Sequence, residues 1–168
     1  MVACAVRNVY PLISGLLLAA LLGGCADDLG SVARRHGVAT QAIVRLSEGL
    51  AVAARRAGDS VEVLEFAEAT EGGWAAEVVA GGRDGEMTAH LVTMGGETGA
   101  RWNSFLFGTA PNGASRVVVD ALPADGGQVS DAVWVLAFRE RDLDPSRLTW
   151  RVLSATGGVL DSGTGITP

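Results

Sequence analysis

The residue whose chemistry is easiest to specify is Cys25, which follows an apolar run at residues 12–22 and the pair Gly23 and Gly24. A cysteine supplies a nucleophilic thiol, and the two glycines offer an extended backbone without side chains, which suits a peptidase cleft. Arg7 places a positive charge before the apolar run, and that run is shorter than the ~20 residues of a membrane-spanning helix. These parts, in this order, predict an export signal that ends at a modifiable thiol.

The tetrapeptide Leu22-Gly23-Gly24-Cys25 resembles the lipobox of bacterial lipoprotein precursors. The resemblance implies that a diacylglycerol group, with acyl chains such as palmitate, forms a thioether on Cys25, and that a peptidase cuts between Gly24 and Cys25. The mature lipoprotein would be anchored in the cell envelope, on the extracytoplasmic face of the cell membrane. In a host with two membranes, Ala26 after the cysteine resembles a signal for the outer membrane. An ordinary signal peptide, an uncleaved anchor and an unexported chain are the alternatives.

The rest of the chain offers only isolated candidates for catalysis or metal binding. His36 and His90 are the only histidines, and neither lies in a metal or nucleophile motif. Ser104 lacks the Gly-x-Ser-x-Gly elbow that exposes a nucleophile at a sharp turn, although a triad with His90 can be drawn. Asp120, Asp125 and Asp131 surround one expected loop, and Asp142 and Asp144 lie in another. Neither loop has the spacing of a calcium-binding loop. The sequence therefore predicts no catalytic, cofactor or metal site.

Two classes of function stay open. The favoured one is a non-enzymatic lipoprotein that binds another envelope protein or has an accessory role in the envelope. The alternative is an envelope hydrolase or carbohydrate-active enzyme that uses loop carboxylates such as Asp125 and Asp142.

Composition limits the partners further. The 168-residue chain carries 13 basic residues, all arginine, against 19 acidic ones, and has no lysine. Loss of Arg7 with the signal leaves 12 arginines against 19 acids, a net charge of −7. An acidic domain repels polyanions at long range, which argues against a nucleic-acid partner. Both cysteines, Cys4 and Cys25, lie in the first 25 residues, so we expect no disulfide in the mature domain.

Residues 29–46 contain a second resemblance. Val32-Ala33, Gly37-Val38, Ile43 and Arg45 match offsets in the helix-turn-helix of lactose-repressor-type regulators. That resemblance implies DNA binding, which conflicts with export. The simpler interpretation is a short helix at residues 31–35 and a second segment at residues 40–56. Apolar residues recur there at three- and four-residue spacing, as on a helix face, although residues 51–54 would also suit a strand.

From residue 61 onward, short apolar runs alternate with Gly, Pro, Asn and Asp, which predicts β-strands joined by turns. The expected strands are residues 61–69, 74–80, 88–94, 102–107, 116–121, 132–139, 148–154 and 159–161. This number and spacing favour a mainly β protein, an antiparallel β-sandwich of about seven or eight strands, immunoglobulin-like or similar, after a short helical or irregular segment. The expected domains are the signal at 1–24, a tether and helical segment at 25–60, and the sandwich at 61–168.

Alternation of apolar and polar residues predicts which faces are buried. Val117 and Val119 oppose Arg116, while Trp150 and Val152 oppose Arg151. Residues 134, 136 and 138 are expected to share one core face. The strand–turn–strand segment at residues 107–119 contains a Phe-Gly-x-x-Pro-x-Gly turn, which resembles turns of uncharacterised secreted β-domains of high-GC Gram-positive bacteria.

Overall fold

The computed structural model describes residues 27–70, 72–85, 88–90, 104–120, 122–138 and 143–166. This part of the chain is mainly β, as predicted, with antiparallel sheets and one short α-helix. The helical elements are α1 (Leu29–Arg35) and the 3₁₀ turns η1 (Thr40–Ala42) and η2 (Pro145–Arg147). The strands are β1 (Val44–Ser47), β2 (Leu50–Ala57), β3 (Ser60–Glu68), β4 (Trp74–Arg83), β5 (Thr88–His90), β6 (Ser104–Thr109), β7 (Ala114–Val119), β8 (Ala124–Gly126), β9 (Val133–Phe138), β10 (Thr149–Ser154) and β11 (Val159–Thr164).

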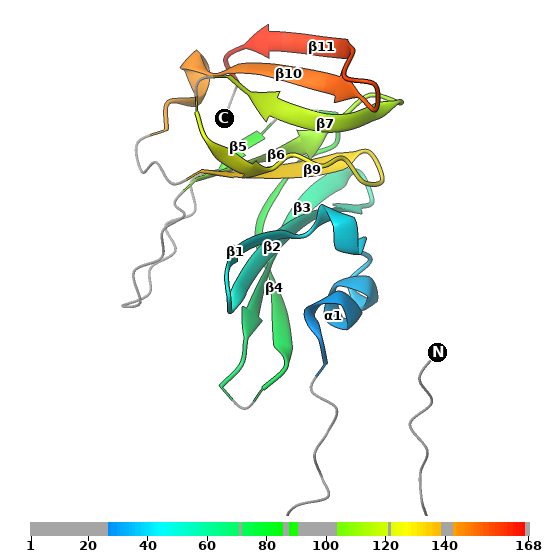
Figure 1. Ribbon diagram of the computed structural model, residues 1–168, viewed down its shortest axis with the longest axis vertical. Coiled ribbons are helices and arrows are strands. Elements are labelled where there is room, and N and C mark those ends of the chain that lie inside the picture. The colour runs from blue at the N-terminus through cyan, green and yellow to red at the C-terminus, as the bar shows by residue number, and fades with distance from the viewer. Residues whose placement is uncertain are drawn as a thin grey trace, which may run out of the picture.

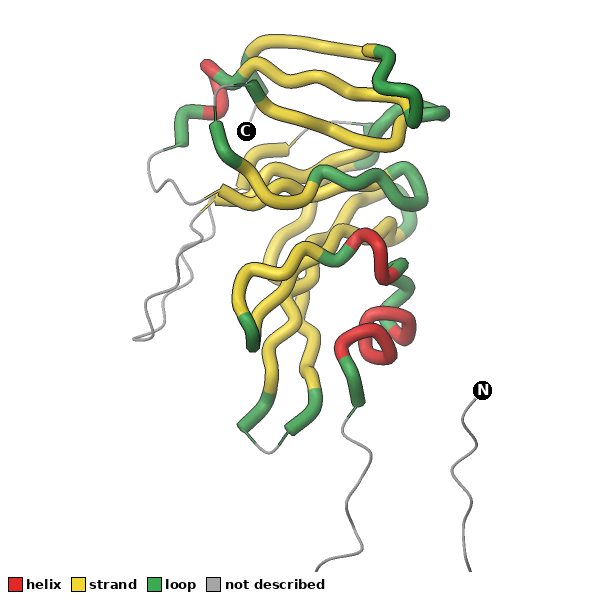
Figure 2. Tube along the Cα trace, viewed as in Figure 1, coloured by secondary structure: helices red, strands yellow, loops and turns green. Residues whose placement is uncertain are grey.

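The strands form three sheets, with the orders β1-β2-β3-β4, β5-β6-β9-β8 and β11-β10-β7. Figure 1 shows them stacked as three layers along the longest axis, with the β5-β6-β9-β8 sheet in the middle. One core lies between the β1–β4 sheet and the middle sheet, and a second lies between the middle sheet and β7, β10 and their connections. A third, smaller core lies under α1, on the outer face of the β1–β4 sheet (Figure 2).

The helical interpretation of residues 40–56 is wrong, and the strand alternative for residues 51–54 is confirmed. Only the 3₁₀ turn η1 forms there, and the chain continues as β1 and β2. Strand β2 pairs with β3 along its whole length, from Leu50 opposite Ala67 to Ala57 opposite Ser60. All four residues at 51–54 are buried, because β2 has a core on each face. The β2–β3 hairpin also crosses residue 60, where the sandwich was expected to start.

The same strands contradict a helix-turn-helix at residues 29–46. Helix α1 agrees with the first predicted helix, and Gly37 turns the chain with φ +74. The position of a recognition helix is occupied by η1 and by β1, which pairs with β2. The recognition helix of that motif is therefore absent from this segment.

The buried faces of β7 and β10 agree with the predicted alternation. Val117, Val119 and Val152 are buried and Trp150 is half-buried, whereas Arg151 is exposed. Strand β9 differs, because all six of its residues are buried. Its odd-numbered residues face the first core and its even-numbered residues face the second. Residues 134, 136 and 138 do share a core face, as expected, but the opposite face of β9 is buried in a core as well.

Two glycines let the chain pass from the middle sheet toward β7. Gly126 and Gly127 have φ values of +101 and +78. A β-carbon on Gly126 would lie 2.5 Å from the Val135 carbonyl oxygen, and one on Gly127 would overlap the Val117 carbonyl oxygen. The Gly127 amide donates a hydrogen bond of 2.8 Å to Val135, and its carbonyl accepts one of 2.7 Å from the Val117 amide. This crossing requires glycine for both backbone angle and space.

Candidate functional site

The predicted lipidation site and cleavage position, Cys25 and Gly24, lie outside the described residues, which begin at Asp27. The described chain begins directly before α1. Asp28 caps α1, because its carboxylate accepts a 2.8 Å hydrogen bond from the Ser31 amide. Hydrogen bonds from Ser31 hold the pKa of Asp28 below its ordinary value. The folded domain therefore starts with a capped helix shortly after the cysteine.

Asp27 attaches the start of the chain to two elements. Its carboxylate forms an ion pair of 2.8 Å with Arg35 at the end of α1. Its backbone also lies against the turn between β3 and β4, since a β-carbon on Gly73 would be 3.7 Å from the Asp27 nitrogen. These contacts fix the position of Asp27 on the surface of the domain.

Ser104 is in a position unsuited to nucleophilic attack. It is the first residue of β6, pairs with Phe138 of β9 and is only 1% exposed. A nucleophile on an elbow stands at a sharp turn open to substrate, whereas Ser104 is enclosed by sheet. His90 ends β5 with its backbone opposite Phe105.

The loop aspartates do not converge. Asp120 forms an ion pair of 2.6 Å with Arg151 on the outer sheet. Asp125 lies in β8 of the middle sheet and is exposed, as is Asp131 in the turn before β9. Within the described ranges, no three His, Cys, Asp or Glu residues are grouped so as to hold a metal ion.

Asp144 has a structural role. Its carboxylate accepts hydrogen bonds from the Ser146 amide at 3.1 Å and from the Ser146 hydroxyl at 2.6 Å, which starts η2. These bonds hold the pKa of Asp144 below its ordinary value. The last predicted candidate, Asp142, lies outside the described residues.

An open groove of ≈ 380 Å³ adjoins the start of the domain, and sequence reasoning did not find it. Leu29 and Gly30 of α1, Thr40 of η1 and Ile43 line it together with Arg45. The Arg45 guanidinium lies 6.0 Å from the centre of the Trp74 ring, within cation–π range. Arg45 and Trp74 come from the two edge strands β1 and β4, so only the folded sheet brings them together.

A second group that sequence reasoning missed joins α1 to the sheet. Arg55 donates to the Glu62 carboxylate through Nε at 2.9 Å and Nη2 at 2.7 Å, and to the His36 carbonyl through Nη1 at 3.1 Å. Recognition of a hairpin around Gly58 and Asp59 would have placed Arg55 opposite Glu62. The group stabilises the docking of α1.

The far end of the molecule presents an edge strand. Strand β11 lies at the edge of its sheet, and its Val159 and Leu160 are 54% and 46% exposed. An edge strand with exposed apolar side chains can pair with a strand of another chain.

No helix in the described part of the chain has the length and apolar character needed to cross a bilayer. Comparisons of the sequence with protein-family models and curated proteins, and of the structure with solved structures, find no match. Function must therefore be argued from the residues themselves.

Proposed function

We propose that this protein is an extracytoplasmic lipoprotein with a non-enzymatic binding or accessory role in the cell envelope. The observation that carries the proposal is the apolar run that ends in Leu22-Gly23-Gly24-Cys25. The capped start of α1 supports it, because the chain is folded from Asp27 onward and leaves only a short tether after the cut. A diacylglyceryl group supplies two acyl chains, which suffice for stable attachment, whereas one chain gives only marginal binding.

The binding role is supported by the chemistry of the described residues. The candidate acids Asp120 and Asp144 are engaged in ion pairs and caps, and Ser104 is enclosed. The exposed edge strand β11 lies at the opposite end of the molecule from the start of α1 (Figure 1). An anchored domain of this shape presents β11 to another envelope protein.

The mass of the N-terminal peptide from membrane-fractionated protein tests the anchor. We expect residues 1–24 to be absent and Cys25 to carry a diacylglyceryl group. The Cys25→Ala variant should keep the signal and lack the lipid, while the Cys4→Ala variant should be processed normally. Because the chain has no lysine, an amine-reactive tag reports on the N-terminus alone. A full-length, unmodified chain outside the membrane fraction would contradict the proposal.

The partner is tested by photo-crosslinking in intact cells, with the crosslinker placed at Leu160 on β11 or, as a control, at Arg34 on α1. Both side chains are exposed. We expect a defined envelope protein to be captured from position 160 and not from position 34. The same mixture of abundant envelope proteins at both positions would count against a specific partner.

A further inference from the structure

Asp27, at the start of the described chain, is held on the domain surface two residues after Cys25. Asp27 is held by Arg35 on one side and lies against Gly73 of the β3–β4 turn on the other. Only Ala26 separates Asp27 from Cys25. An extended chain spans at most ~3.6 Å per residue, so the two steps from Cys25 to Asp27 cover at most about 7 Å.

This reach is short compared with the domain. A compact chain of this length has a radius of gyration of about 14 Å. A tether of half that length does not allow the domain to rotate freely above its anchor. The surface around Asp27 must therefore face the bilayer.

We infer that the anchored domain stands with the β3–β4 turn and the start of α1 on the lipid headgroups, and with the β7-β10-β11 sheet farthest from the membrane. The inference rests on the proposed lipidation of Cys25. In Figure 1 these two parts lie at opposite ends of the longest axis, so this axis is close to the membrane normal.

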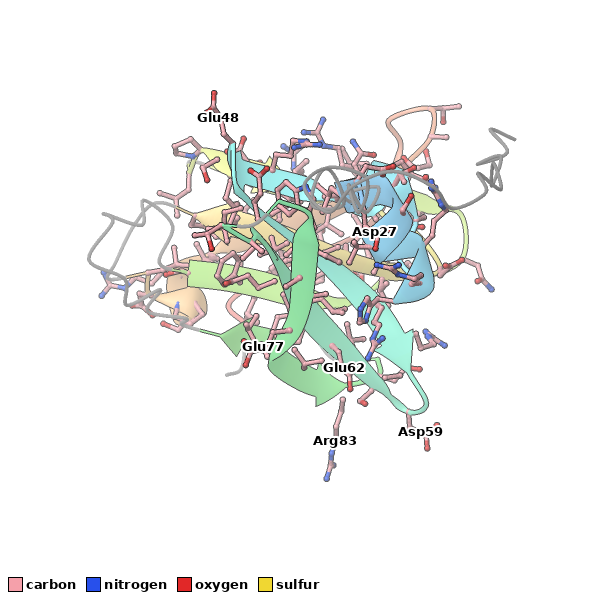
Figure 3. All side chains as sticks on the ribbon, turned by 90° about the horizontal axis from the view of Figure 1, so that it is seen from below. Asp27, Glu48, Asp59, Glu62, Glu77 and Arg83 are labelled. Carbon is pink, nitrogen blue, oxygen red and sulfur yellow. The ribbon has the colours of Figure 1, made fainter. Side chains whose placement is uncertain are left out.

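The side chains at this end suit a headgroup layer of zwitterionic lipid. Trp74 comes directly after Gly73, is half-buried and lies beside the Arg45 guanidinium. Indole and guanidinium groups have an apolar body and a polar part, which favours the boundary between acyl chains and water. Figure 3 views the molecule from this end and labels Asp27, at the start of the described chain, and Glu77 of β4. Asp27 is paired with Arg35, and the Arg45 guanidinium lies beside Trp74, so charges of both signs lie at this end. The tether, rather than attraction to anionic lipid, holds the domain in place.

The orientation is measured with single thiol-linked fluorophores on the processed, full-length mature protein in phosphatidylcholine vesicles. Thr70 in the β3–β4 turn and Thr156 in the β10–β11 turn form a matched pair, because both are exposed turn threonines. In the processed protein Cys4 is gone and the sulfur of Cys25 is a thioether, so Thr70→Cys or Thr156→Cys introduces the only free thiol.

Energy transfer to acceptor-labelled lipid headgroups is the readout. We expect quenching at position 70 to exceed quenching at position 156 by about twofold or more, because a compact domain of this length separates its two ends by roughly two radii of gyration. Insertion of 20 Gly and Ser residues between Ala26 and Asp27 gives a tether with a mean reach of about 25 Å. This variant should lose most of the difference between the two positions.

The outcomes separate the orientation from the anchor. Equal quenching at both positions with the native tether, or stronger quenching at position 156, overturns the orientation while the mass of lipidated Cys25 still supports the anchor. Quenching at neither position, together with an unmodified Cys25, overturns both.

Discussion

Strands β9 and β10 have the same length and each contains a tryptophan, yet they occupy different environments. All six residues of β9 are buried, whereas in β10 exposed and covered positions alternate from Thr149 to Val152 and the last two residues are half-buried. Both indole N–H groups donate to backbone carbonyls, that of Trp134 to Thr109 at 3.1 Å and that of Trp150 to Gly165 at 3.3 Å. The strands differ in position, because β9 lies in the middle sheet and β10 in an outer one.

The two environments predict that polar substitutions are tolerated in the outer sheet and not in the middle one. The middle sheet has a core on each face, so a polar group at residues 105–108 of β6 or in β9 has no solvent to face. The outer sheet leaves one face free for charged groups such as Arg151. Charged and polar side chains are therefore accommodated on the outer layers.

The largest predicted effect tests the two tryptophans directly. Trp134 is 1% exposed in the second core, and Trp134→Ala should lower the free energy of unfolding by about 3–5 kcal/mol. Trp150 is half-buried, and Trp150→Ala should cost roughly half as much. Urea denaturation followed by circular dichroism measures both. Equal losses would show that the two strands are equally enclosed.

The next prediction compares Gly127, in the crossing beside β9, with the control Gly113, in the turn before β7. Gly113→Ala should cost about 1 kcal/mol, because φ is +84 but nothing lies within 4 Å of the new β-carbon. Gly127→Ala meets the same backbone cost and also overlaps the Val117 carbonyl oxygen, so it should cost about 1–3 kcal/mol more. The same denaturation assay gives the difference. Equal costs for the two variants would mean that the crossing can shift without penalty.

The contrast between β9 and β10 also explains how far the sequence could predict the fold. The alternation in β10 correctly identified its buried face. The sequence Val133–Phe138 is a continuous apolar run, which is typical of a strand buried on both faces, but its aromatic alternation suggested a single face. The same ambiguity affected residues 51–54, where small apolar residues suit a helix face and a doubly buried strand equally well.

The site is less predictable than the fold. The resemblance to a lipobox and the isolated acids can be read in the sequence, but the groove beside Arg45 depends on the packing of α1 and β1. The contact of Asp27 with Gly73 likewise depends on the way the β3–β4 turn meets the start of α1. The sequence spacing of Arg45 and Trp74, or of Asp27 and Gly73, does not predict that these residues are in contact.

A smaller predicted effect compares two adjacent arginines of β2, Arg55 beneath α1 and Arg56 in an exposed ion pair. Arg55 binds Glu62 and the His36 carbonyl under α1, and its side chain is 27% exposed. Arg55→Lys loses the planar fork and should cost about 1 kcal/mol. The adjacent Arg56→Lys alters only the exposed pair with Asp84 and should cost less than about 0.5 kcal/mol. Thermal unfolding ranks the two, and a larger loss for Arg56→Lys would contradict the structural role of Arg55.

The smallest predicted effect is the cost of a charged Glu65 next to the buried valines of β3. Val61 and Val63 are fully buried, and Glu65 comes next on the same face. Burial raises the pKa of Glu65 above its ordinary value of 4.5, and the negative charge of Glu77 raises it further. Glu77 lies directly opposite Glu65 on β4. Like charges in directly opposed cross-strand positions are destabilising, by about 0.2–1 kcal/mol.

The sign of the pH dependence is set by the raised pKa. Below pH 4.5 Glu65 is protonated in both the folded and the unfolded chain, so Glu65→Gln should leave the free energy of unfolding nearly unchanged. As the pH rises through the folded pKa, the unfolded chain releases its proton more readily, and the parent protein loses stability relative to the variant. Glu65→Gln should therefore be the more stable protein at pH 7. Glu77→Gln removes the repulsion but not the burial of Glu65, so its gain at pH 7 should be smaller. Paired melting curves at pH 3.5 and pH 7 measure these differences, and a variant that is less stable than the parent at pH 7 would show that the charged form of Glu65 is favoured by the fold.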